Sequence, residues 1–180
     1  KVCVDHYHHI EEDIRLFAEM GLKAYRFSIA WTRILPKGRG RVNPKGVEHY
    51  HKVIDTCMKY DITPIVTMFH FDLPYELEKE GGWNNPNTIE AFAEYAEVLF
   101  REYGEKVPYF ISINEQNVMI LKGAVIGTNL EGENQWKKLY QQNHYMQLAQ
   151  ARANILCHKL APKAKIGPAP NISPAYPKSE

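Results

Sequence analysis

The residues best suited to chemistry stand where apolar, β-branched runs end. Residues 109–113 form such a run, and Asn114, Glu115 and Gln116 follow it directly. The run predicts a buried strand, and polar groups at its end are costly to bury unless they are hydrogen-bonded or used. In parallel α/β folds, the carboxyl ends of strands carry the functional groups. Glu115 is therefore the first candidate for a catalytic group, against the alternative of a carboxylate that caps the next helix or pairs with an arginine.

Two other apolar runs contain further candidate functional residues, which we expect at the same edge of a parallel sheet as Glu115. Arg26 lies within the predicted strand 24–31, and His70 lies near the end of the predicted strand 63–71. No thiol stands at a strand end and no serine lies in a G-x-S-x-G turn, so nucleophile-plus-histidine acyl transfer has no support. A carboxylate, an arginine, amides, an imidazole and aromatic rings suit a sugar, because amides and imidazole bind hydroxyls while carboxylates act on the glycosidic bond. Trp31 and Trp83 fit a sugar platform or the core equally well.

Strands and helices are predicted to alternate along the whole chain. Helices are expected at 5–21, after Asn43-Pro44, from Asn87 to Gly104 and at 134–160, with short strands at 24–31, 63–71, 109–114 and 165–169; no element is placed at 118–134. Caps are expected at Asn43 and at Asn87 with Glu90, and Trp136, Leu139, Met146, Ala149, Ala153 and Leu156 should face inward from the last helix. Alternation of this kind predicts a parallel sheet, either doubly wound or a (β/α)₈ barrel.

The loops favour the barrel over a nucleotide-binding fold. The first strand-to-helix turn contains neither G-x-G-x-x-G nor G-x-x-x-x-G-K-[ST], whereas long loops rich in aromatic and amide residues follow the strands. Only about four βα units are present, and a barrel needs eight strands. Residues 1–180 are therefore expected to form a single partial domain, the N-terminal half of a (β/α)₈ barrel from a longer chain.

Composition and net charge exclude some classes of binding partner. The chain has 180 residues, 44% of them hydrophobic, and 22 basic against 21 acidic residues give a net charge of +1. This balance argues against nucleic acid or an anionic membrane as a partner, and no apolar run approaches the roughly 18 residues that span a bilayer. Cys3, Cys57 and Cys157 are odd in number and far apart, which favours reduced thiols and a cytoplasmic location. His6, His8 and His9 suggest hydrogen bonds at a helix entry rather than a metal site, and no cofactor is expected.

Five segments, in one unbroken order, resemble glycoside hydrolase family 1. They are Asp5-His6-Tyr7-His8-His9 with Glu12-Asp13-Ile14, Tyr25-Arg26-Phe27-Ser28-Ile29-Ala30-Trp31-Thr32-Arg33-Ile34, His70-Phe71-Asp72-Leu73-Pro74, Gly82-Trp83 and Asn114-Glu115. The resemblance implies a (β/α)₈ barrel and retaining hydrolysis of β-glycosides. It implies that Glu115 is the general acid/base and that Asn114 binds the sugar 2-hydroxyl. It also implies that His70 binds the sugar at the cleavage site and that Arg26 hydrogen-bonds the nucleophile.

Departures from the family pattern refine the expectation. Gln116 stands where the family usually has proline, and residues 116–117 and 165–171 resemble the branch that acts on 6-phosphorylated sugars. The family's nucleophile, a glutamate in a Thr-Glu-Asn-Gly type segment, and its phosphate-binding loop are absent and are expected beyond residue 180, so the 180 residues alone should be inactive. The resemblance thus implies a 6-phospho-β-glucosidase acting on β-linked phosphodisaccharides or aryl β-glucosides. A plain β-glucosidase or β-galactosidase, or a non-catalytic carbohydrate-binding relative, remains the alternative.

Overall fold

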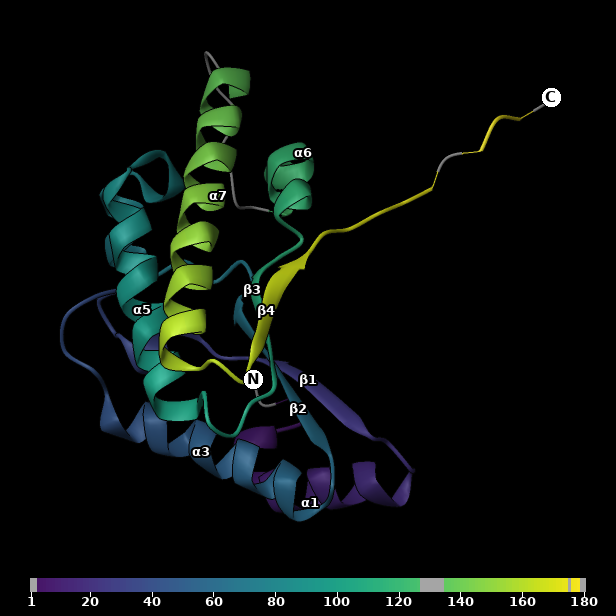
Figure 1. Ribbon diagram of the computed structural model, residues 1–180. Coiled ribbons are helices and arrows are strands. Elements are labelled where there is room, and N and C mark those ends of the chain that lie inside the picture. Colours follow the sequence, from purple (N-terminus) through teal and green to yellow (C-terminus); the bar gives the residue numbers. More distant parts are fainter. Residues whose placement is uncertain (1–2, 127–134, 175, 179–180) are drawn as a thin grey trace.

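The computed structural model describes residues 3–126, 135–174 and 176–178, and helices and strands alternate through them (Figure 1). In chain order the elements are α1 (His6–Glu19), β1 (Ala24–Ser28), α2 (Trp31–Ile34), α3 (Pro44–Lys59), β2 (Thr63–Phe69), α4 (Tyr75–Lys79), the 3₁₀ helix η1 (Gly82–Asn84), α5 (Asn87–Tyr103), β3 (Tyr109–Asn114), α6 (Gln116–Ile126), α7 (Gln135–Leu160) and β4 (Lys165–Ala169).

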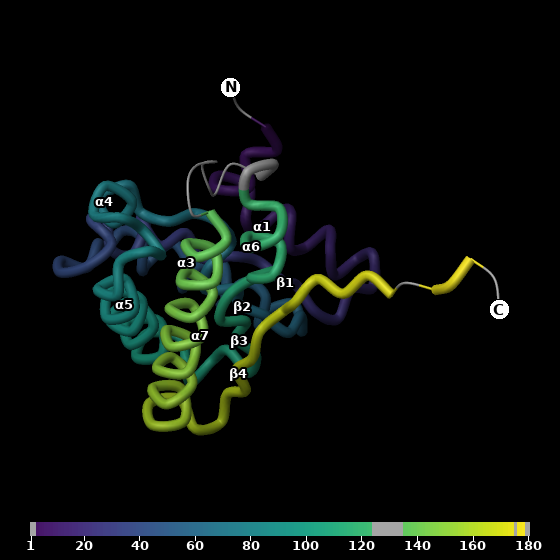
Figure 2. Tube along the Cα trace, turned by 90° about the horizontal axis from the view of Figure 1, so that it is seen from above, coloured from purple at the N-terminus to yellow at the C-terminus, as the bar shows by residue number. Residues whose placement is uncertain are grey.

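The four strands form one parallel sheet in the order β1-β2-β3-β4. Strand order follows chain order without reversal, whereas a doubly wound sheet reverses direction at a switch point. Helices α3, α5 and α7 accordingly lie on the same face of the sheet, with α5 and α7 side by side (Figures 1 and 2). This is the winding of a (β/α)₈ barrel, as the sequence predicted, and it brings the carboxyl ends of all four strands to one edge.

The main core lies between the sheet and these helices, and aromatic rings dominate it. Trp31 is fully buried and stacks on Tyr95 of α5 with ring centroids 5.0 Å apart. Trp83 is 4% exposed and packs edge-on against Phe69 of β2 and Phe92 of α5. Both tryptophans are therefore core residues, which decides between the core and the sugar-platform interpretations.

The predicted helices are present, but the two predicted caps work differently. Asn43 occupies the N-cap position of α3, yet its side-chain amide donates to the Arg33 carbonyl at 2.9 Å and makes no cap bond. Asn87 is the first residue of α5, and its backbone N–H donates to the Asn85 side chain at 3.0 Å. Glu90 pairs with an arginine of α7 instead of the helix start. Asn43 and Glu90 thus bind partners distant in sequence, and the side chain at the start of α5 that binds a backbone N–H is Asn85 instead of Asn87.

Other differences concern where elements begin and end. The predicted strands 24–31 and 63–71 end earlier, at Ser28 and Phe69, because Trp31 starts the short helix α2 and His70 starts a loop. Residues 118–126, for which no element was predicted, belong to helix α6, whose consecutive apolar residues hide the helical period. Residues 127–134 lie outside the described part of the chain.

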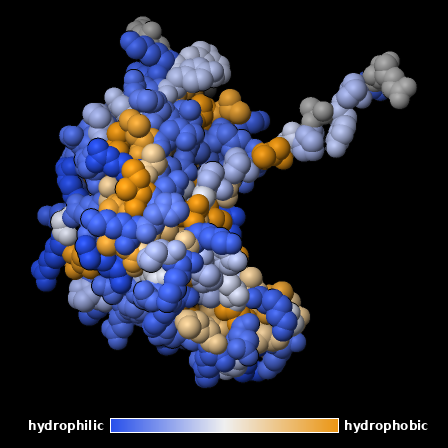
Figure 3. Space-filling view, viewed as in Figure 1, coloured by the Kyte–Doolittle hydropathy of each residue, from blue (hydrophilic) through white to orange (hydrophobic). Residues whose placement is uncertain are grey.

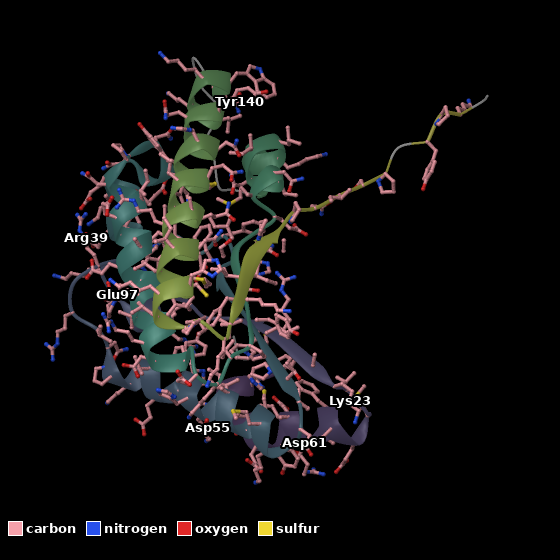
Figure 4. All side chains as sticks on the ribbon, in the orientation of Figure 1. Lys23, Arg39, Asp55, Asp61, Glu97 and Tyr140 are labelled. Atoms are coloured by element: carbon pink, nitrogen blue, oxygen red, sulfur yellow. The ribbon has the colours of Figure 1, made fainter. Side chains whose placement is uncertain are left out.

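The prediction that Trp136 faces inward from α7 is wrong. Its side chain is 64% exposed, while Leu139, Met146, Ala149 and Ala153 are buried as predicted. The first turns of α7 extend past the sheet beside α6 (Figure 1), so Trp136 has no core to face there. Tyr140, one turn further on, also points away from the body at the upper end of α7 (Figure 4) and is 65% exposed.

The cysteines are unpaired, as predicted from their odd number and wide spacing. All three cysteines are free, with Cys57 and Cys157 buried and Cys3 exposed. No helix among the described residues is long and apolar enough to cross a membrane. The face shown in Figure 3 is mainly hydrophilic with scattered apolar patches, and it is hollowed on the side from which the C-terminal segment leaves the body.

The three histidines at the start of α1 each contact a carboxylate. His6 lies 2.6 Å from Asp13, and His8 and His9 contact Asp5 and Glu12 at 2.8 and 3.3 Å. These are the helix-entry hydrogen bonds that the sequence predicted. No cluster of three or more potential ligands that could hold a metal ion occurs among residues 3–126, 135–174 and 176–178.

Candidate active site

Three neighbouring strands bring Arg26, His70 and Asn114 into one hydrogen-bonded chain. Arg26 of β1 donates from its Nη2 to the Asn114 Oδ1 at 2.5 Å and from its Nε to the Thr67 Oγ1 at 2.9 Å. The Asn114 amide nitrogen in turn lies 3.2 Å from the His70 Nε2. Asn114 ends β3, His70 follows β2 and Arg26 lies in the middle of β1, and the sheet brings these three predicted residues together.

Arg26 fixes the orientation of the Asn114 amide. A guanidinium can only donate, so the atom of Asn114 that it contacts must be the carbonyl oxygen. The amide nitrogen of Asn114 then faces the His70 Nε2 and must donate to it. His70 therefore accepts at Nε2 and carries its ring proton on Nδ1. Asn114 is only 3% exposed, so its amide has a defined direction in a buried setting.

Glu115 is held by groups on both sides of it. Its φ of 42° lies in the left-handed region, which is strained for a residue with a side chain. Its backbone N–H donates to the Ala169 carbonyl of β4 at 2.9 Å, and its own carbonyl accepts from the Val118 N–H at 2.9 Å as α6 begins. The unusual backbone turns the half-buried side chain out of the strand pattern at the end of β3.

The Glu115 carboxylate accepts a hydrogen bond from an amide that sequence reasoning did not single out. The Asn171 Nδ2 lies 3.2 Å from the Glu115 Oε1. Asn117 holds Asn171 in place through two bonds, because its amide donates to the Asn171 carbonyl at 2.6 Å and its oxygen accepts from the Asn171 N–H at 3.0 Å. The signal in the sequence was a polar residue just past the last strand. Thus Arg26, Asn114 and His70 form one chain, while Asn171 engages Glu115 separately.

Asp72 was a second missed residue, and it holds the loop that carries His70. Its two carboxylate oxygens accept from the backbone N–H groups of His70 at 3.2 Å and Trp31 at 3.3 Å. Burial raises the pKa of the Asp72 carboxyl, and the backbone donors oppose this rise. Phe71, between His70 and Asp72, has a φ of 71°. Asp72 therefore ties the ends of β1 and β2 together and supports a strained turn beneath His70.

A cavity of about 610 Å³ opens beside this chain. Arg26, Thr67 and His70 line one part of it, and Tyr7 and His49 from α1 and α3 line another. The Tyr7 and His49 rings are stacked with centroids 4.5 Å apart. Asn114 and Glu115 do not line it, so the cavity adjoins the predicted site on the side of Arg26 and His70.

A singly wound parallel sheet with polar groups at its carboxyl edge defines an α/β-barrel protein of the (β/α)₈ class. The profile of Glycosyl hydrolase family 1 matches residues 1–180. The chain belongs to this family. The five sequence segments and the fold thus lead to the same assignment.

Curated relatives and solved structures describe the family further. The chain is 42% identical over 180 residues to the aryl-phospho-β-D-glucosidase BglC of Bacillus subtilis, covering 99% of the chain and 38% of that protein. It is 39% identical over 179 residues to β-glucosidase A of Acetivibrio thermocellus, covering 99% and 40%. A β-glucosidase structure from Thermotoga maritima in complex with castanospermine superposes with a TM-score of 0.91 at 41% identity, covering 98% of this chain and 40% of that one. The chain therefore spans about 40% of the length of these relatives.

Proposed function

We propose that this chain contributes the general acid/base and part of the sugar-binding site of a retaining β-glycosidase. The observation that carries the proposal is the hydrogen-bonded chain Arg26–Asn114–His70 at the strand ends, with Glu115 next to Asn114. In a retaining mechanism, one carboxylic acid protonates the leaving oxygen while a carboxylate about 5–5.5 Å away attacks the anomeric carbon. Glu115 takes the first role and then acts as base on the incoming water. We assign the nucleophile to a carboxylate outside these 180 residues, and we assign to Arg26 a hydrogen bond with it.

Asn114 and His70 are assigned to the sugar. The Asn114 amide contacts the 2-hydroxyl, where hydrogen bonds strengthen as the oxocarbenium-like transition state forms. His70 contacts a hydroxyl of the same sugar; because its Nε2 accepts from Asn114, its Nδ1–H is the group that can donate to that hydroxyl. The buried position of Asn114 and the Asp72-supported turn under His70 favour fixed directions for both groups.

A glutamine variant tests the acid role in a full-length protein that contains this chain. Glu115→Gln keeps the shape of the side chain but cannot protonate a leaving group. Hydrolysis of a substrate with a poor leaving group, such as an alkyl β-glucoside, should fall about 10²–10⁴-fold, while an activated dinitrophenyl β-glucoside loses far less. Glu97→Gln, an exposed carboxylate of α5, is the matched control (Figure 4). Equal losses for both leaving groups would remove Glu115 from the acid role.

For the substrate we propose 6-phospho-β-glucosides, with unphosphorylated β-glucosides or β-galactosides as the alternative. Support comes from Gln116 in place of proline and from the 42% identity to an aryl-phospho-β-D-glucosidase. The similarly close β-glucosidase A keeps the alternative open. The test compares kcat/KM for p-nitrophenyl β-glucoside and its 6-phosphate. A preference for the phosphorylated compound is expected; a preference for the plain one would overturn the assignment, and binding without turnover would indicate a carbohydrate-binding relative.

A further inference from the structure

Directly behind Glu115, a chain of polar side chains runs through the interior between β3, α6 and α7. The Ser112 hydroxyl of β3 donates to the Gln150 Oε1 of α7 at 2.6 Å. The Gln150 Nε2 donates to the Gln116 Oε1 at the start of α6. The Gln116 Nε2 donates to the Asn143 Oδ1 at 2.7 Å and to the Asn143 backbone carbonyl at 3.2 Å. Ser112, Gln116 and Gln150 are all less than 8% exposed.

The chain has one direction, and a backbone carbonyl sets it. The Asn143 carbonyl can only accept, so the Gln116 atom that faces it must be the amide nitrogen. The Gln116 oxygen then faces Gln150, which must donate to it, and the Gln150 oxygen is left to accept from the Ser112 hydroxyl. The Gln116 and Gln150 amides therefore each have a single orientation that matches these bonds. Fully satisfied buried polar networks are rigid, whereas a network with one member missing leaves costly unpaired groups.

This network holds the residue that follows Glu115. Glu115 adopts a left-handed φ of 42°, and its N–H is fixed to Ala169 of β4. On the other side, the side chain of Gln116, the first residue of α6, is hydrogen-bonded to Asn143 and Gln150 of α7. A strained conformation persists when the surrounding structure over-determines it. Gln116 supplies that constraint from the α7 side, and β4 supplies it from the other.

We propose that Gln116 and Gln150 are positioning residues, which keep Glu115 in its left-handed conformation and so aim its carboxyl group at the leaving-group oxygen. The inference rests on the proposed role of Glu115 as the proton donor. The competing interpretation is that the network only ties α7 to the sheet. The two differ in what a broken network does: misaimed proton donation penalises poor leaving groups, whereas general loosening penalises all substrates alike.

The test uses a full-length protein that contains this chain. Gln150→Met keeps the length of the side chain but removes the bonds to Ser112 and Gln116. We expect kcat on an alkyl β-glucoside, or on its 6-phosphate if that is the form hydrolysed, to fall about 10-fold or more, with less than about a 3-fold loss on the dinitrophenyl glycoside and little change in KM. Gln147→Met, on the exposed side of α7, is the matched control and should leave both rates unchanged.

A second variant keeps the test decisive if Gln150→Met does not fold. Asn143 is half-buried, and Asn143→Ala removes one acceptor while retaining the backbone carbonyl and helix propensity. It should shift the leaving-group dependence in the same direction by a smaller factor. Equal losses on both substrates, or no loss, in the folded variants would overturn the positioning role. That result is separable from failure of the proposed function, because Glu115→Gln would still show its own leaving-group dependence.

Discussion

At the scale of single residues, the orientation of the Asn114 amide links the structure to the proposed chemistry. Its amide is buried, is oriented by Arg26 of β1 and hydrogen-bonds His70 in the loop after β2. A group oriented before the substrate arrives loses little freedom when the transition state forms. The orientation comes from Arg26, which can only donate, so the direction of the Asn114 amide follows from the identity of its neighbour.

Asn114→Ala should therefore lower kcat/KM through the loss of one contact, the hydrogen bond to the sugar 2-hydroxyl. In a full-length protein containing this chain, we expect kcat/KM on a β-glucoside, or its 6-phosphate, to fall about 100-fold, since bonds to the 2-hydroxyl contribute several kcal/mol in the transition state. On the corresponding 2-deoxyglucoside the variant and the parent should agree within about 3-fold. Comparable losses on both substrates would mean that Asn114 serves the structure of the site rather than the 2-hydroxyl.

Sequence reasoning found the residues whose chemistry is visible in their type and place. Arg26, His70 and Asn114 stand at or near strand ends, so the alternating pattern was enough to predict that they meet. Asp72 and Asn171 were not predicted, because each depends on a loop conformation. Asp72 binds backbone N–H groups across a turn with a positive φ, and Asn171 reaches Glu115 only because Asn117 holds it.

At the scale of elements, Tyr95 joins helix α5 to the sheet. Its hydroxyl lies 2.9 Å from both the Ile29 carbonyl after β1 and the Met68 carbonyl of β2. The side chain is fully buried, and burial raises the pKa of Tyr95 well above its usual value. One hydroxyl thus serves two buried carbonyls next to the strand ends that carry the candidate site.

Tyr95→Phe should lower the free energy of unfolding by about 1–3 kcal/mol, because buried carbonyls lose their donor while the ring packing on Trp31 remains. Urea unfolding of the full-length protein measures this. Tyr140→Phe is the matched control, since Tyr140 is 65% exposed on α7 and should change the unfolding free energy by less than about 0.5 kcal/mol. Equal effects of the two changes would contradict the bridging role of Tyr95.

The contact between α1 and α3 predicts a pH dependence. His49 stacks on Tyr7, and burial, with the nearby charges of Arg33, His6 and Lys52, lowers the pKa of His49 to about 4. The pKa of an unfolded histidine is about 6.5. The unfolded chain then binds more protons between these values, so the stability due to neutral His49 is complete above about pH 6.5 and is lost as the pH falls to about 4.

His49→Gln should reduce this acid sensitivity. Because the side chain is only partly buried, solvent screening limits the effect to about 1 kcal/mol of unfolding free energy between pH 6.5 and 4. Denaturant unfolding at the two pH values measures it, with His158→Gln, an exposed histidine of α7, as the control. If His49→Gln and the parent lose stability equally on acidification, another group is responsible.

The elements themselves were predictable where a periodic face was clear, as in α3 and α5, and where short β-branched runs were bounded by glycine or proline. Helix α6 was not predicted, because its residues are apolar at consecutive positions and no apolar face of a helix stands out. The inward prediction for Trp136 assumed that α7 is covered along its whole length. The position of a helix end relative to the sheet depends on loop geometry, which local sequence does not encode.

At the scale of the whole molecule, Glu115 is the carboxyl group next to the hydrogen-bonded chain Arg26–Asn114–His70. Asp72 also lies at the strand ends, but both of its oxygens accept from backbone N–H groups. Retaining hydrolysis requires a second carboxylate about 5–5.5 Å from the first. The purified 180-residue chain should therefore show no turnover of dinitrophenyl β-glucoside or its 6-phosphate above the Glu115→Gln variant of the same chain. Measurable turnover that depends on Glu115 would refute this expectation.

In the proposed mechanism, Glu115 acts first as the acid and then as the base of a retaining enzyme. Glu115→Ala in a full-length protein containing this chain removes the base that activates water but leaves room for a small anion. With a dinitrophenyl glycoside, which needs no acid, added azide should accelerate turnover and yield the β-glycosyl azide, because azide attacks the glycosyl-enzyme without base assistance. An α-glycosyl azide would make Glu115 the nucleophile. Unchanged turnover with water as the sole acceptor would remove Glu115 from the reaction.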